Sequence, residues 1–182
     1  TESKILRDVV KPGDAWFNTG DLIRQVDVGF ALGKAHYQFV DRVGDTFRWR
    51  SENVSTNEVG EILNGHDQIE MANVYGVDVP ATEGKAGMVS VILKPGQVFD
   101  VDAFSTFVNA NLTHFSQPVF VRVQPEATTT GTFKLLKGDL RKQAFHIDQV
   151  TDDLYVLPPR GKQYQKLERD LYNSIMDGSA GY

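Results

Sequence analysis

The chain changes character across two adjoining stretches, FVDRVGDTFRW (residues 39–49) and ENVSTNEV (residues 52–59). The first forty residues are polar and rich in turn residues, and they resemble trailing strands of a preceding domain. From His36 onward, apolar and polar residues alternate. This period of two predicts a half-buried hairpin around Gly44. Its apolar positions are Tyr37, Phe39, Phe47 and Trp49.

A helix is predicted directly after this hairpin. Ser55 followed by Glu58 forms a capping box, in which each residue satisfies a backbone N–H at the start of a helix. Val59, Ile62 and Leu63 then share one apolar face. The Asn64-Gly65 pair is typical of a helix end.

The rest of the chain alternates short strands and helices. Residues 71–79 and 87–93 are strand-like and suggest an antiparallel pair, and residues 119–123 predict a third strand. Helical spacing appears at residues 100–112 and 136–145. A last helix carries Leu167, Leu171 and Ile175 and ends at Gly178. The pattern predicts an α+β fold with a small mixed or antiparallel sheet and flanking helices.

The composition excludes several classes of function. The formal net charge of -5 provides no field that would attract nucleic acid, so the basic-aromatic FRWR (residues 47–50) is interpreted as a strand rather than a base-stacking strip. The chain has no cysteine, which fits a reducing cytoplasm. The longest apolar run, MVSVIL, is too short to span a bilayer as a helix. The four histidines show no metal-ligand spacing, and no metal site is predicted.

Five elements together carry a resemblance to a known family. They are WFNTGDL (16–22), DRVGDTFRW (41–49), ENVSTNEV (52–59), VYGVDVP with EGKAGM (74–80 and 83–88), and GTFKLLKGDLRK (131–142). Their order resembles the C-terminal part of an acyl-CoA synthetase of the adenylate-forming superfamily. The FRW and ENVST elements and the tail DDLYVLPP (152–159) are most similar to the fatty-acid-transport-protein or very-long-chain acyl-CoA synthetase branch. The resemblance implies that residues 1–41 are a remnant of the large domain and residues 42–182 the mobile C-terminal domain.

Two residues are implied to bind the nucleotide. Asp21 follows Gly20 in a turn where its carboxylate could accept two hydrogen bonds from the ribose hydroxyls of ATP. The alternative is an aspartate that caps its own turn. Arg42 could hold ribose or phosphate with its fixed set of donors, or it could be a surface arginine paired with Asp41 or Asp45.

The catalytic residue implied by the resemblance is Lys134. A lysine at this point would bridge the fatty carboxylate and the α-phosphate while pyrophosphate leaves. The family pattern has glycine closer to the lysine than Gly131 is here, so Lys137 remains a competitor. Gly44 occupies the position of the family's hinge, about which the small domain would rotate between two half-reactions; it could equally be a hairpin-turn glycine.

Ser51, Glu52 and Asn53 lie where the family presents a glycine-containing turn to CoA. Ser51 replaces the expected glycine, and Asn53 replaces an arginine that some synthetases use near CoA phosphate. These residues could instead simply initiate the helix.

The implied activity is ligation of a long-chain or very-long-chain fatty acid to CoA through an acyl-adenylate, with ATP, Mg²⁺ and CoA as cofactors or substrates. The isolated fragment is expected to be inactive. An aryl-CoA ligase, a carrier-protein loader and a freestanding binding module remain as alternatives. The expected location is cytoplasmic, with peripheral membrane contact left open for the full-length protein.

Overall fold

The computed structural model describes residues 2–30, 33–42, 46–124 and 137–182, with the side chains of residues 3 and 40–42 excepted. Contacts within the chain form two compact units, Thr1–Gly44 and Asp45–Tyr182, here called unit 1 and unit 2. The predicted boundary between residues 41 and 42 falls just before this division. The assignment of these parts to a large and a mobile domain stays a prediction.

Unit 1 consists of a short 3₁₀ helix and two separate strand pairs. The helix spans Glu2–Lys4. Strand β1 (Ile5–Arg7) pairs antiparallel with β2 (Ala15–Phe17), and β3 (Asp21–Val26) pairs antiparallel with β4 (His36–Arg42). The predicted strand character of this region is confirmed.

The hairpin predicted around Gly44 is wrong. Phe39 in β4 lies opposite Ile23 of β3, whereas β5 (Phe47–Trp49) pairs with β6 (Glu52–Val54). Alternation shows that a segment is a strand but does not say which strand it joins. Within β5 the predicted alternation holds, because Phe47 and Trp49 are buried and Arg48 is exposed.

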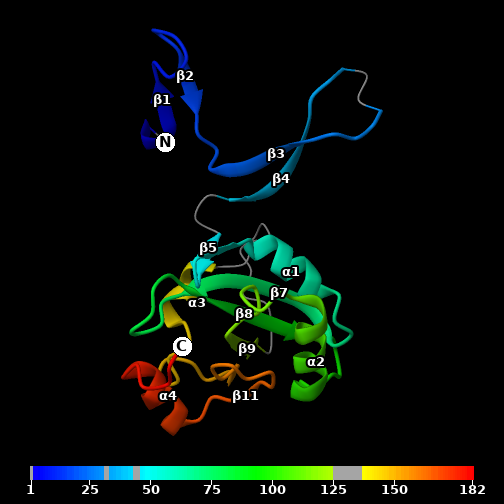
Figure 1. The fold of residues 1–182 in the computed structure, drawn as a ribbon, viewed down its shortest axis with the longest axis vertical. Helices are drawn as coiled ribbons and strands as arrows, with labels where there is room; N and C mark the ends of the chain where they lie inside the picture. The colour runs from blue at the N-terminus through cyan, green and yellow to red at the C-terminus, as the bar shows by residue number, and fades with distance from the viewer. Residues whose placement is uncertain (1, 31–32, 43–45, 125–136) are drawn as a thin grey trace. The chain divides into compact units, whose positions relative to one another are not determined.

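Unit 2 is built on a five-stranded mixed sheet in the order β11-β10-β9-β8-β7 (Figure 1). The strands are β7 (Ile69–Val77), β8 (Ala86–Leu93), β9 (Phe120–Gln124), β10 (Asp153–Val156) and β11 (Gln165–Lys166). Only β8 and β9 run parallel, and α2 (Val101–Asn111) lies in the connection between them, as a parallel crossover requires. The predicted α+β class and small mixed sheet are confirmed. Strands β10 and β11 were not predicted.

Helices cover both faces of this sheet. Because side chains alternate along a strand, Val74 and Tyr75 of β7 lie on opposite faces. A Cβ on Gly60 of α1 (Thr56–Asn64) would lie 3.8 Å from Val74. On the other face, Phe120, which shares a row with Met88 and Tyr75, stacks on Phe145 with ring centroids 4.0 Å apart.

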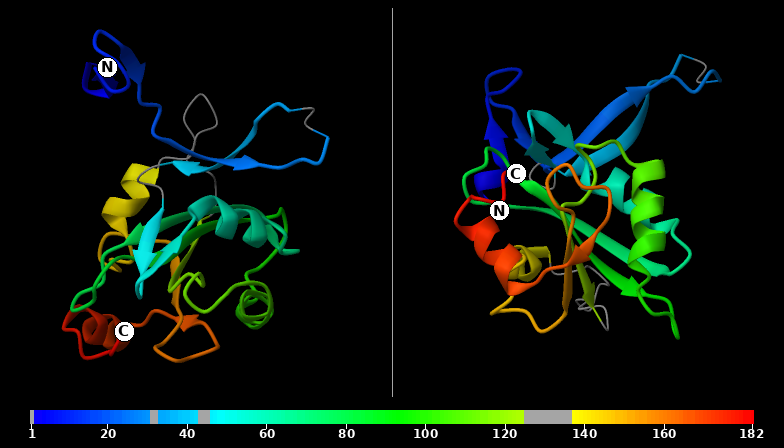
Figure 2. Two further views of the ribbon diagram at one scale, coloured as in Figure 1. Left: turned by 45° about the horizontal axis from the view of Figure 1, so that its top comes forward. Right: turned by 60° about the horizontal axis from the view of Figure 1, so that its bottom comes forward.

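The last two helices lie on the face of the sheet where Phe120 stacks on Phe145. Helix α3 (Lys137–Gln143) precedes Phe145, whose ring centroid lies 6.2 Å from that of Tyr172 in α4 (Arg169–Met176). Figure 2 shows both helices, α3 in yellow and α4 in red. Both helices were predicted, although Leu167 lies before α4 rather than inside it. Gly178, with φ +79°, follows the end of α4 as expected.

Side-chain caps set the starts of α1 and α2, of which only the cap of α1 was predicted. The backbone N–H of Glu58 donates to Ser55 Oγ at 3.3 Å, which confirms that half of the capping box. Asp100 Oδ1 accepts from the N–H groups of Asp102 and Ala103 at 3.0 Å and starts α2. Helix α1 ends at Asn64 as predicted, although Gly65 has φ -76° and needs no glycine-specific conformation.

Candidate functional site

The two predicted nucleotide ligands face each other across one strand pair. Asp21 and Arg42 are Cα partners at the end of the β3–β4 ladder. The turn before Asp21 is closed by other side chains: Gly20 N–H donates to Asn18 Oδ1 at 2.9 Å, and Asp21 N–H donates to Thr19 Oγ1 at 3.2 Å. Gly20 has φ +79°, so the turn uses the freedom of glycine. The side chain of Arg42 lies outside the described residues.

Two further predicted residues, Gly44 and Lys134, lie outside the described residues. Lys137, the competitor of Lys134, is the first residue of α3. Its Nζ donates to Oγ1 of the buried Thr56 at 3.2 Å, which joins the start of α3 to the start of α1. Lys137 therefore has a structural contact inside unit 2.

The residues predicted on the CoA side form a hairpin turn and a strand. Trp49 and Glu52 are Cα partners, so Arg50 and Ser51 make a two-residue turn, with φ 49° and 68°. The alternative that Ser51, Glu52 and Asn53 initiate the helix is wrong, because Ser55 caps α1 after β6 has ended. A turn with positive φ at both positions favours glycine or asparagine. This explains why a glycine is the residue expected at position 51.

The hairpin is attached to the β7–β8 connection by its backbone. Lys85 N–H donates to the carbonyl oxygen of Arg48 at 2.7 Å. Gly84 has φ +86°, and a Cβ built on it would lie 2.2 Å from that oxygen. Only glycine fits there, because any other side chain would collide with backbone. The EGKAGM element gives no sign of this contact in the sequence, because the contact depends on the tertiary fold.

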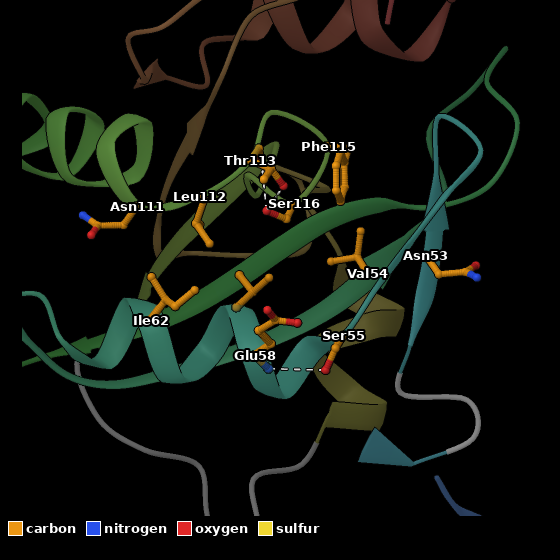
Figure 3. A pocket seen from close by; sticks show the side chains of 11 residues that line it. Asn53, Val54, Ser55, Glu58, Ile62, Asn111, Leu112, Thr113, Phe115 and Ser116 are labelled. Atoms are coloured by element: carbon orange, nitrogen blue, oxygen red, sulfur yellow. Dashed lines mark hydrogen bonds between the residues drawn. The ribbon is translucent and has the colours of Figure 1, made fainter. Parts of the chain in front are cut away.

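A pocket of about 290 Å³ lies beside the same hairpin (Figure 3). It separates α1 from the loop that follows α2. Its walls are apolar at Val54, Ile62 and Phe115, and neutral polar residues, among them Asn53 and Ser116, also line it. The amide of Asn53 points away from the other lining residues in Figure 3. Glu58 is the only charged residue in the lining, so the pocket suits a neutral group better than an anion.

The buried side chain of Arg122 connects the strand before the lysine segment to the helix after it and also forms an ion pair. Arg122 of β9 is 7% exposed, and its Nε donates to Asp152 Oδ2 at 2.6 Å. Its Nη1 donates to Gln143 Oε1 of α3 at 2.7 Å. Burial raises the pKa of Tyr75 nearby, so its hydroxyl stays protonated. The sequence pattern gave no signal for this pair, because an arginine in a short strand is usually exposed.

No group of three His, Cys, Asp or Glu side chains that could hold a metal ion occurs within residues 2–30, 33–42, 46–124 and 137–182. In that same part of the chain, no helix is long and apolar enough to cross a membrane.

Comparison with known proteins identifies relatives of the chain. Residues 58–134 match the family model of the AMP-binding enzyme C-terminal domain. A long-chain fatty acid transport protein 6 from Mus musculus is 46% identical over 97% of the chain and 28% of its own length. A medium/long-chain fatty-acid–CoA ligase from Mycobacterium tuberculosis is 43% identical over 86% of the chain and 25% of its own length.

The fold has solved counterparts. The structure of O-succinylbenzoate CoA synthetase from Bacillus subtilis, in complex with AMP, superposes with a TM-score of 0.56 at 22% identity, covering 71% of this chain and 24% of that one. At this identity the likeness establishes the fold alone. The chain spans about a quarter of the length of the curated relatives named above.

Proposed function

We propose that this chain, which carries the AMP-binding enzyme C-terminal domain and is related over nearly its whole length to the long-chain fatty acid transport proteins, is part of a fatty acid–CoA ligase. The complete enzyme would activate a long-chain or very-long-chain fatty acid with ATP and transfer the acyl group to CoA, releasing AMP and pyrophosphate. The observation that carries the proposal is the 46% identity over 97% of the chain.

The first half-reaction would join the fatty carboxylate to the α-phosphate of ATP. Asp21 would bind the ribose hydroxyls of ATP. Arg42 would bind the ribose or the phosphates. Their opposed positions on β3 and β4 support a joint role. Mg²⁺ would enter the reaction on the phosphates of ATP.

Lys134 is proposed to stabilise the negative charge that develops on the reacting carboxylate and phosphate. Two observations favour it over Lys137. The family match ends at residue 134, and Lys137 already donates to Thr56 within unit 2. Lys134 would contribute a mobile cation rather than a structural contact.

The second half-reaction would use the β5–β6 turn of unit 2. Rotation about Gly44 would withdraw the lysine segment from the reacting groups and bring the turn at Ser51 to them instead. Glu52 and Asn53 would then lie beside the CoA thiol. The rigid attachment of this hairpin through Gly84 supports the idea that the turn moves as one body with unit 2. The location of the complete enzyme in the cytoplasm, and any peripheral contact with a membrane, remain part of the proposal.

The test is substrate profiling of the full-length enzyme from which this chain comes. AMP and acyl-CoA formation with palmitate or longer acids, but not with aryl acids, supports the proposal. Turnover of aryl acids alone, or transfer only to a carrier protein, would assign it to another adenylate-forming ligase. An absence of ATP-dependent turnover with any acid would favour a non-catalytic binding module.

A further inference from the structure

A row of polar side chains crosses the sheet of unit 2 on the face that packs against Phe145. Ser90 of β8 is the Cα partner of Asn73 in β7 and of Arg122 in β9, and all three residues are buried. The Ser90 hydroxyl donates to Oε1 of Gln124, the last residue of β9. Among the described residues, Arg122 is the only Lys, Arg, Asp or Glu that is buried. The row therefore brings a charged side chain inside unit 2, near the end of β9.

The guanidinium of Arg122 joins β9 to two segments that follow it in the chain. Its Nε donates to Asp152 Oδ2 at 2.6 Å, just before β10. Its Nη1 donates at 2.7 Å to Oε1 of Gln143, the last residue of α3. The lysine segment, residues 125–136, lies outside the described residues; β9 ends directly before it and α3 begins directly after it. Arg122 therefore holds together the two elements that flank the lysine segment.

Each end of the lysine segment has a second attachment within unit 2. On one side, Gln124 accepts the hydrogen bond from Ser90. On the other side, Lys137 Nζ donates to Oγ1 of the buried Thr56 in α1 at 3.2 Å. The chain therefore leaves β9 and enters α3 at positions that side-chain contacts fix, and Arg122 relates one position to the other.

Stability alone does not account for an arginine at this position. Replacing a buried ion pair by apolar side chains of similar volume is often neutral or stabilising, because both charges lose their hydration in the folded state. On the same face of β7, Nδ2 of Asn73 and the hydroxyl of Tyr75 are buried without a hydrogen-bond partner among the described residues. Unpaired buried polar groups cost free energy. Proteins retain such costly local arrangements mainly at functional sites.

We propose that Arg122 is a positioning residue for the adenylation half-reaction. By holding α3 to β9, its guanidinium fixes the span that the lysine segment bridges, and so the position from which Lys134 acts. This inference rests on the proposed function, in which Lys134 stabilises the reacting carboxylate and phosphate. Arg122 acts only through Lys134, since its Nε and Nη1 donate within unit 2. A displacement of about 1 Å in a reacting group can cost about a hundredfold in rate.

The experiment breaks the contact with α3 and keeps the ion pair. In the full-length enzyme, Gln143→Met removes the acceptor of Arg122 Nη1 at nearly constant volume and leaves Asp152 in place. Acyl-adenylate formation should slow about tenfold, while thioester formation from supplied acyl-adenylate and CoA should stay within about twofold. Unfolded enzyme would lower both rates by the same factor, so the ratio of the two rates reports positioning rather than stability. Equal loss of both half-reactions, or unchanged adenylation, would overturn the proposal.

Two variants serve as controls. Gln143→Glu keeps an oxygen acceptor for Arg122 and should restore adenylation to within about threefold of the wild-type rate. Gln68→Met makes the same substitution at a glutamine whose Nε2 donates to the carbonyl oxygen of Val98 at 2.7 Å, and it should leave both half-reactions within about twofold. A loss of adenylation in Gln143→Glu or in Gln68→Met as large as that in Gln143→Met would show that the contact of Arg122 does not set the rate, and would overturn the proposal.

A double-mutant cycle tests whether Arg122 acts through Lys134. In a Lys134→Ala background, Gln143→Met should lower the remaining adenylation by less than about twofold, because the group that the contact positions is gone. A further loss of about tenfold in that background would show an effect independent of the lysine and would overturn the proposal. Wild-type enzyme that forms acyl-CoA while Gln143→Met retains full adenylation refutes the positioning role alone. Wild-type enzyme that forms no acyl-adenylate refutes the proposed function, and the positioning role with it.

Discussion

Units 1 and 2 place their apolar side chains in opposite ways. In unit 2, Tyr75, Phe104 and Phe120 are completely buried in one continuous core. In unit 1, Trp16, Ile23 and Phe30 are 53%, 62% and 77% exposed, and no described residue before Phe47 belongs to that core. Exposed apolar side chains in this number are typical of a surface that contacts another protein, a membrane or a ligand.

The difference shows where each unit obtains its stability. Unit 2 buries its own apolar area, which is the dominant favourable contribution to folding. Unit 1 has two short strand pairs and no core, and isolated pairs of this kind are marginal in water. This contrast fits the proposal that unit 1 belongs to a large domain and unit 2 is a self-sufficient mobile one.

The largest expected effect comes from removing a core ring of unit 2. Phe104→Ala should lower the free energy of unfolding by about 3–5 kcal/mol, because the completely buried ring touches His66, Phe99 and Tyr164. The measurement is urea denaturation in a Trp16→Phe background, in which Trp49 of unit 2 is the only tryptophan.

The matched control for this prediction is Phe39→Ala in unit 1. Phe39 is 50% exposed, so its removal should change the stability of unit 2 by less than about 0.5 kcal/mol. Comparable losses of unfolding free energy for Phe104→Ala and Phe39→Ala would contradict the division into one unit with a hydrophobic core and one without.

The next largest effect concerns the buried ion pair. Arg122→Ala should cost about 3 kcal/mol, because Asp152 would keep a poorly solvated charge without its partner. Arg169→Ala removes an exposed pair with Asp148 and should barely change stability. Thermal unfolding of both variants tests this, and similar losses would mean that Arg122 is no more than a surface cation.

A smaller effect depends on pH. Burial against Phe104 and Phe107 lowers the pKa of His66 below its ordinary 6.5. Below pH 6.5 the unfolded chain therefore binds more protons than the folded chain. The stability that neutral His66 contributes is complete above pH 6.5 and is lost as pH falls through the folded pKa. His66→Gln should flatten the decline in melting temperature between about pH 7 and 5. An unchanged slope of melting temperature against pH would mean that a group other than His66 titrates in this range.

The smallest effect is expected from deleting unit 1. A chain beginning at Asp45 should retain the unfolding free energy of unit 2 within about 0.5 kcal/mol, since the core starts at Phe47. Trp49 fluorescence during denaturation measures it directly. A large loss would show that unit 2 depends on residues 1–44.

Local chemistry made much of unit 2 predictable. Ser55 starts α1 through a side-chain hydrogen bond to a residue three positions away, and the sequence displays this pattern directly. Asp100 starts α2 in the same local way, although its cap was not predicted. Strand pairing was harder, because the partner of Phe39 is Ile23 and not Phe47. The short strand at Leu154 and Val156 was also missed, although both side chains alternate with more exposed neighbours.

The roles of the candidate site residues stay predictions, and the structure adds which of these residues lie together. Asp21 and Arg42 prove to be cross-strand partners, whereas Gly44 and Lys134 lie outside the described residues. The ion pair of Arg122 joins residues thirty positions apart and depends on the tertiary fold.

The most direct test of the ligase proposal separates its two half-reactions. In the full-length enzyme, Lys134→Ala should lower the rate of acyl-adenylate formation by at least about a hundredfold, because it removes the cation proposed to stabilise the reacting groups. Thioester formation from supplied acyl-adenylate and CoA should continue at nearly the wild-type rate, and Lys137→Ala should retain adenylation. Equal loss of both half-reactions in Lys134→Ala, or full adenylation, would contradict the account.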